Sequence, residues 1–125
     1  METIKSFFFD TYALLEIISG NLNYSPYMSG VSVVTTKLNL MELHYCLLRT
    51  SGKAKADSYF DSFNEFCVKY NDDIVKEANE FKLKLNKRDL SYVDCIGYTV
   101  AKRLGIKFLT GDKQFKDLDN VEFVK

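Results

Sequence analysis

The segment "FFFDTYALLEI", residues 7–17, constrains the fold most, because an apolar run stops at a carboxylate and leads straight into a helix. Phe7 to Phe9 are typical of a strand that is buried on both faces. Asp10, which ends the run, is a preferred helix N-cap. It is also an acid at the carboxyl end of a strand, where α/β folds place their active sites. Asp10 alone does not decide between these two roles.

Strand-like runs and amphipathic helices alternate along the rest of the chain. The strands are expected at residues 4–9, 31–36, 106–110 and 121–124, and the helices at 11–19, 37–49, 53–70, 72–86 and 91–104, with a tyrosine-containing loop at 21–30. Strands separated by helices imply parallel pairing with crossover helices, so the pattern predicts an α/β sandwich. A chain of 125 residues without a linker or repeat predicts one domain, residues 1–125.

Charge and cysteine content limit the classes of function. The chain has 17 basic and 17 acidic residues, so attraction of the whole surface to nucleic acid or membrane is not expected. Cys46, Cys67 and Cys95 are widely spaced in apolar segments, which indicates small buried hydrophobes in a reducing compartment. No signal-peptide core precedes Asp10, and no stretch approaches the ~18 apolar residues of a membrane span. We therefore expect a cytoplasmic protein.

Asp112 is a second acid that follows a strand, in "FLTGD", residues 108–112. If its strand is parallel and adjacent to the first, Asp10 and Asp112 lie at the same edge of the sheet. The alternative is an ordinary turn residue after Gly111.

Glu42 lies in a helix that is apolar nearly all round. A glutamate there must be paired, bind a cation or line a wet cleft, because a bare buried charge is too costly. The alternative is a partly exposed side chain that reaches Arg49.

Asp94 follows Ser91 by three residues, which is the spacing of a helix capping box. On the helical wheel Asp94 also lies on the flank of the small residues Gly97 and Ala101, where another group can approach. Both interpretations can hold together.

Other motifs narrow the chemistry further. The single histidine, His44, argues against a histidine-rich metal site and against a Ser-His-Asp triad, and we expect it to be structural or on the surface. "KLKLNKR", residues 82–88, is typical of a solvated helix end and could also contact phosphates. No phosphate-binding or dinucleotide-binding glycine motif is present. The remaining acids form an oxygen-only set, which suits Mg²⁺ or Mn²⁺ and phosphoryl chemistry.

Three segments resemble the PIN-domain nucleases, and in particular the VapC-type toxins of toxin–antitoxin pairs. They are "FFFDTYALLEI" at 7–17, "TKLNLMEL" at 36–43 and "LSYVDCIGYTVAKRLGIKFLTGDKQF" at 90–115. The resemblance covers nearly the whole chain. It implies a three-layer α/β/α sandwich with a parallel sheet and a Mg²⁺- or Mn²⁺-dependent ribonuclease that cleaves RNA.

Carried over by motif, the resemblance also assigns residues and partners. It implies a small antitoxin protein and a homodimer, and we expect Tyr24 and Tyr27, beside Pro26, to serve a protein interface. The acids Asp10, Glu42, Asp94 and Asp112 match the catalytic and metal-binding quartet, Thr11 and Thr110 match hydroxyl positions near the metal, and Asp117 is an auxiliary candidate.

Alternative functions stay open. One is an RNA-processing PIN nuclease without an antitoxin, and another is a non-catalytic domain that binds RNA or protein while its acids only cap helices. A third is aspartyl phosphotransfer with Asp10 as the nucleophile. The phosphatases of that class need a second aspartate two residues later, where this chain has Tyr12.

Overall fold

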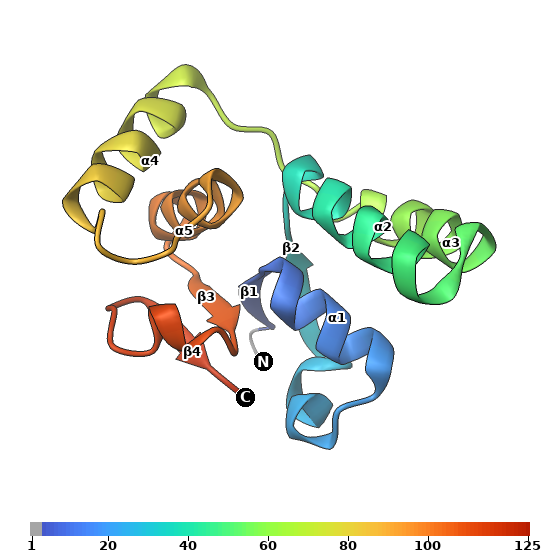
Figure 1. Ribbon diagram of the computed structural model, residues 1–125. Helices are drawn as coiled ribbons and strands as arrows, with labels where there is room; N and C mark the ends of the chain where they lie inside the picture. The colour runs from blue at the N-terminus through green and yellow to red at the C-terminus, as the bar shows by residue number, and fades with distance from the viewer. Residues whose placement is uncertain (1–3) are drawn as a thin grey trace.

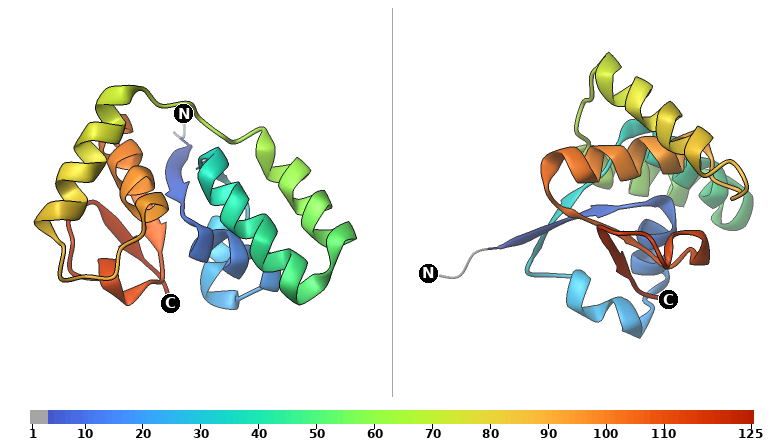
Figure 2. Two further views of the ribbon diagram at one scale, coloured as in Figure 1. Left: turned by 45° about the horizontal axis from the view of Figure 1, so that its top comes forward. Right: turned by 90° about the vertical axis from the view of Figure 1, so that its left-hand side faces the viewer.

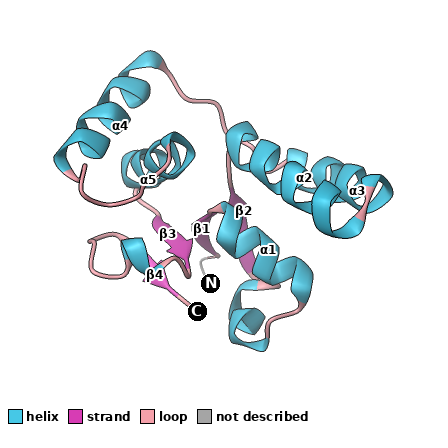
Figure 3. Ribbon diagram, viewed as in Figure 1, coloured by secondary structure: helices cyan, strands magenta, loops and turns pink. Residues whose placement is uncertain are grey.

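The computed structural model describes residues 4–125 and contains a four-stranded parallel sheet flanked by helices (Figures 1 and 3). The strand order is β2-β1-β3-β4, and every pairing is parallel. The α/β fold with a parallel sheet is therefore as predicted. The elements are β1 (Lys5–Phe9), α1 (Thr11–Ser19), η1 (Leu22–Tyr27), β2 (Val31–Val34), α2 (Lys37–Ser51), α3 (Lys53–Asn64), α4 (Asp72–Lys84), α5 (Tyr92–Leu104), β3 (Lys107–Thr110), η2 (Lys113–Phe115) and β4 (Val121–Phe123).

The phenylalanine run of β1 divides the core into two halves. Successive side chains of a strand point to opposite faces. Phe7 and Phe9 pack with residues of α1, α2 and α3, whereas Phe8 packs with residues of α4 and α5. Helices therefore cover both faces of the sheet, as the views in Figure 2 show. This explains why a central strand can be apolar at consecutive positions.

The parallel register brings the carboxyl ends of β1 and β3 together. Phe9 is opposite Leu109, and the Asp10 N–H donates to the Leu109 carbonyl at 3.3 Å. One residue connects β1 to α1, and two residues connect β3 to η2. These two short connections, from distant parts of the sequence, therefore meet at one edge of the sheet.

The helix expected at residues 53–70 is shorter than predicted, because α3 ends at Asn64. The chain beyond it pairs with the backbone at the end of β2 instead. The Thr35 N–H donates to the Phe66 carbonyl at 3.0 Å, and the Val68 N–H donates to the Thr35 carbonyl at 2.9 Å. These long-range bonds replace the helical bonds that the apolar periodicity had predicted.

Tyr24 lies in the core of the monomer, so the expectation of a protein interface at Tyr24 is wrong. Tyr27 is half-buried against that core, and an interface there stays a prediction. Tyr24 is fully buried in η1, and its hydroxyl donates to the Val124 carbonyl at 2.6 Å. Tyr27 packs edge-on against Phe7, with ring centroids 5.2 Å apart. The rest of η1 is mostly exposed, so the segment contributes the Tyr24 side chain to the core.

Of the three cysteines expected to be buried, only Cys95 is, and Cys46 and Cys67 are half-buried. All three cysteines of the described residues are free. His44 Nε2 lies 2.7 Å from Asp57 Oδ1 on the neighbouring helix. Across residues 4–125, no helix has both the length and the apolar content needed to span a membrane.

Candidate active site

Asp10 occupies the centre of the site, at the junction of β1 and α1. It is the N-cap of α1, and its Oδ1 accepts a hydrogen bond from the Ala13 N–H at 2.8 Å. Only 3% of the residue is exposed. Burial raises the pKa of Asp10 to about 8, and the charges of Asp94 and Asp112 add to the rise. The Thr110 hydroxyl and the Ala13 N–H oppose it by stabilising the carboxylate.

Glu42 is half-buried on α2 and is held by the first residue of α1. The Thr11 hydroxyl donates to Glu42 Oε1 at 2.7 Å. The interaction with Arg49 that was the alternative does not form, since the Arg49 guanidinium lies over the Tyr45 ring, 5.4 Å from its centroid. Thr11 thus lies beside an acid of the predicted quartet.

Asn39 belongs to the same arrangement and was missed by the sequence interpretation. It is 2% exposed, accepts from the Thr36 hydroxyl at 2.6 Å and donates through Nδ2 to Thr11 Oγ1 at 3.3 Å. A chain of hydrogen bonds therefore runs from Thr36 through Asn39 and Thr11 to Glu42. The available signal was an amide three residues before Glu42, on the same face of an otherwise apolar helix.

Asp94 lies in the first turn of α5, and both halves of its capping box are present. The Ser91 N–H donates to Asp94 Oδ2, and the Asp94 N–H donates to Ser91 Oγ, each at 3.0 Å. Burial raises the pKa of Asp94, the Ser91 contacts oppose this, and the charges of Glu42 and Asp112 raise it further. The capping interpretation is confirmed, and Asp94 also lies within the field of two other acids.

Asp112 caps η2 immediately after β3. Its Oδ1 accepts from the Gln114 N–H at 2.9 Å, and its own N–H donates to the Thr110 hydroxyl at 3.0 Å. Thr110 is fully buried and contacts both acids at this edge of the sheet. Gly111 lies between them where a Cβ atom would come within 2.2 Å of the Tyr12 ring.

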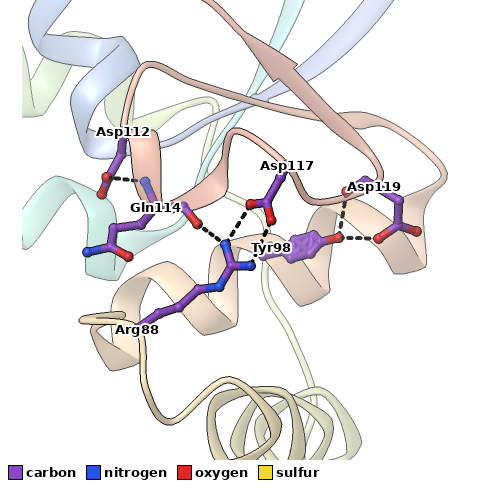
Figure 4. A network of polar contacts seen from close by, with 6 residues as sticks. All are labelled: Arg88, Tyr98, Asp112, Gln114, Asp117 and Asp119. Atoms are coloured by element: carbon purple, nitrogen blue, oxygen red, sulfur yellow. Dashed lines mark hydrogen bonds and ion pairs between the residues drawn. The ribbon is translucent and has the colours of Figure 1, made fainter.

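Asp117, the auxiliary candidate, is engaged elsewhere. Arg88 donates to both of its oxygens, Nη1 to Oδ1 at 2.7 Å and Nη2 to Oδ2 at 2.9 Å. The Arg88 guanidinium lowers the pKa of Asp117. Arg88 also donates to the Gln114 carbonyl at 2.6 Å, so this ion pair supports the turn that carries Asp112 (Figure 4).

The donor set fits a hard divalent cation. Asp10, Glu42, Asp94 and Asp112 come from four segments and supply only oxygen ligands. Burial raises the pKa values of Asp10 and Asp94, and the charges of neighbouring acids of this set add to both rises. Within residues 4–125 no three His, Cys, Asp or Glu side chains are arranged so that they could hold a metal ion by themselves. Mg²⁺ does not require such an arrangement, because it keeps several waters and is usually bound by one or two carboxylates plus substrate phosphates.

The fold and the sequence together define the class of this protein. The PIN domain model matches residues 7–121, and the chain belongs to the PIN domain family. A search of curated proteins found no match.

Solved structures of VapC toxins and VapBC complexes share the fold. VapC20 of Mycobacterium tuberculosis, described as a sarcin-ricin loop cleaving toxin, aligns with a TM-score of 0.72 and 19% identity over 95% of this chain and 99% of that one. DNA-bound VapBC from Salmonella typhimurium aligns with a TM-score of 0.74 and 14% identity over 97% of each chain. A toxin–antitoxin complex from Klebsiella pneumoniae gives 0.70 and 16%, over 92% of this chain and 94% of that one. At these identities the likeness concerns the fold.

Proposed function

We propose that this protein is a Mg²⁺- or Mn²⁺-dependent endoribonuclease. The observation that carries the proposal is the position of Asp10. It is buried at the edge of the sheet, and the nearby charges of Asp94 and Asp112 raise its pKa further. Acids that only capped helices would have no reason to share one electrostatic site at a high cost in stability. Placement at the carboxyl edge of a parallel sheet, where α/β proteins bind ligands, further supports a substrate site.

The residues divide the work as follows. Asp10, Glu42, Asp94 and Asp112 would hold the cation, which when bound supplies an activated water and neutralises charge on the scissile phosphate. The Ala13 N–H, the Ser91 N–H and the Gln114 N–H each fix one oxygen of an aspartate, and Thr11 fixes Glu42. These bonds orient the carboxylates before substrate arrives, which reduces the ordering that the reaction must supply.

We further propose that the nuclease is the toxin of a toxin–antitoxin pair. The complexes of its structural neighbours support this, as does an exposed apolar stripe on α2 beside Glu42, formed by Met41, Tyr45 and Leu48. A segment of a small antitoxin that covered this stripe would also block access to the acids. The homodimer remains a proposal that rests on the family resemblance, since Tyr24 lies in the monomer core and Tyr27 is half-buried against it.

Asp94→Asn tests the nuclease directly. Asparagine can still accept the Ser91 N–H bond, so the cap of α5 survives while a ligand charge is lost. We expect cleavage of an unstructured RNA in Mn²⁺ to fall about a hundredfold or more, because even outer partners of metal ligands are worth 10- to 100-fold. The matched control is Asp61→Asn, an exposed aspartate on α3, which should cleave like the parent.

Two results would overturn the assignment. Full activity in Asp94→Asn would show that Asp94 is not part of the catalytic site. An equal loss in Asp94→Asn and Asp61→Asn would show that cleavage responds to the net charge of the protein and not to this position. Thermal midpoints of both variants close to the parent's show that the comparison concerns folded protein.

A further inference from the structure

A cavity of about 280 Å³ lies between the end of α4 and the start of α5, the helix that carries Asp94. Its walls are Asn79, Lys82, Leu83, Asn86, Arg88 and Tyr92. We propose that this cavity binds an unpaired nucleobase of single-stranded RNA and so positions the adjoining phosphates at the acidic site. The inference rests on the proposed nuclease function, and it names a part of the substrate that the carboxylates themselves do not recognise.

The lining has the charge that an RNA site requires. It combines two amides with Lys82 and Arg88 and has no carboxylate of its own. Arg88 is paired with Asp117, so Lys82 supplies the net positive charge of the lining. Three other cavities of the described residues each include at least one acid, among them Glu77, Asp57 and Glu16. In a chain with zero net charge, binding of a polyanion depends on such a local patch.

Tyr92 provides a surface for stacking. It is the first residue of α5 and is 66% exposed, so its ring packs against little of the protein's own core. The Lys82 ammonium lies 5.0 Å from the ring centroid and is held by a hydrogen bond to the Leu90 carbonyl. An exposed aromatic ring with a fixed cation beside it is the usual platform for bases of single-stranded nucleic acid.

The cavity is connected to the acids through two short paths. Tyr92 and Asp94 share the first turn of α5. Arg88 donates to the carbonyl of Gln114, whose N–H in turn donates to Asp112, as Figure 4 shows. The helix that carries Tyr92 thus also carries Asp94, and the turn that Arg88 supports carries Asp112, so an RNA strand seated on Tyr92 can extend toward these carboxylates.

The composition favours RNA over a protein partner. Interface hot spots bury aromatic and aliphatic side chains together in a dry pocket. Here Leu83 is the one aliphatic residue of the lining and Tyr92 the one aromatic residue, and the other four are amide or cationic. Asn79 and Asn86 have the donors and acceptors that read base edges.

The test is binding of a fluorescein-labelled, unstructured 12-nucleotide RNA in EDTA, which keeps cleavage out of the measurement. We expect Tyr92→Ala to weaken binding about tenfold to a hundredfold, the usual value of one base–aromatic stack. Tyr92→Phe keeps the ring and should stay within about twofold of the parent. The control is Tyr45→Ala, because Tyr45 is 61% exposed with Arg49 over its ring, yet lies on α2; it should bind like the parent.

The outcomes separate this inference from the nuclease proposal. Unchanged binding by Tyr92→Ala, an equal loss in Tyr45→Ala, or no RNA binding by the parent would overturn the inference, even if the parent cleaves RNA with Mn²⁺. Loss of a protein partner by Tyr92→Ala, with RNA binding intact, would also overturn it. RNA binding that depends on Tyr92 in a protein that never cleaves would support the inference and remove the nuclease.

Discussion

At the scale of single residues, each aspartate of the site also holds the backbone in place. Asp10 caps α1, Asp94 completes the capping box of α5, and Asp112 caps η2. The sequence does not separate capping from a role in the site, because both use the same feature, an acid where a helix starts. Local spacing could predict the caps, whereas the shared electrostatic field depends on how distant segments pack.

The buried carboxyl of Asp10 should make stability depend on pH in the metal-free protein. Burial raises its pKa from 3.8 to about 8 in the folded chain, so between these pH values the folded state keeps a proton that the unfolded state has lost. The free energy of unfolding should therefore fall as pH rises from about 4 to about 8. Asp10→Asn keeps an N-cap acceptor but cannot ionise, so its fall should be much smaller.

Urea unfolding in EDTA at several pH values measures this difference. The other titrating groups are common to both proteins, so the parent minus variant difference isolates Asp10. Parallel curves for the two proteins would show that Asp10 does not carry the raised pKa.

Asn39 shows what residue patterns leave out. Its contact with Thr11 joins two helices, and no local rule predicts which hydroxyl a buried amide will reach. The sequence interpretation identified Glu42 as anomalous in its helix. The hydrogen bonds that connect Glu42 to Thr11, Asn39 and Thr36 depend on the packing of α1 against α2, which the sequence pattern does not give.

At the scale of elements, strands and capped helices were predictable and the connections between them were not. The helices that begin at Thr11, Lys37 and Asp72 start where expected, because each follows a capping residue. Residues 65–71 and η1 departed from expectation because backbone groups there bond to distant strands or to local 3-10 turns. Apolar periodicity reports burial and does not distinguish these cases.

The tight turn between β3 and η2 should tolerate no side chain at Gly111. A Cβ atom there would lie 2.2 Å from the Tyr12 ring and 2.5 Å from the Val124 carbonyl. Gly111→Ala should cost about 1–3 kcal/mol of stability, the usual cost of overpacking. It should also lower RNA cleavage by the folded protein, because the displaced turn carries Asp112.

Gly97→Ala is the matched comparison for that variant. Its Cβ atom would meet the Phe8 ring at 2.8 Å, in the core between α5 and the sheet. We expect a similar loss of stability by urea unfolding, with cleavage per folded molecule retained. A Gly111→Ala protein that is as stable and as active as the parent would contradict the close approach.

At the scale of the whole molecule, the net charge provides no long-range electrostatic attraction to RNA. The 17 basic and 17 acidic residues cancel, so capture of substrate depends on the few groups around the acidic site. Such a surface leaves room for control by a protein partner, because an antitoxin segment that covers a small area can remove most of the binding sites at once.

The partner proposal predicts a particular behaviour of the purified protein. Light scattering at micromolar concentration should give twice the 14.4 kDa mass of one chain. A small protein encoded beside it should abolish RNA cleavage, and replacement of Met41 and Leu48 by serine should weaken that inhibition while leaving cleavage itself unchanged. A monomeric mass would contradict the dimer. Inhibition that is equally strong in the parent and in the variant with serine at Met41 and Leu48 would show that the partner does not bind the α2 stripe.

The pairing of β1 with β3 has a consequence for synthesis on the ribosome. β1 emerges early but gains its second neighbour only after Lys107–Thr110 has been translated, and Asp10 meets Asp112 only then. Domains fold as units, so the acidic site comes together late, when nearly all of the matched domain has been made. The proposed nuclease activity would therefore be absent from the nascent chain, and it would begin only when β3 joins the sheet and brings Asp112 to Asp10.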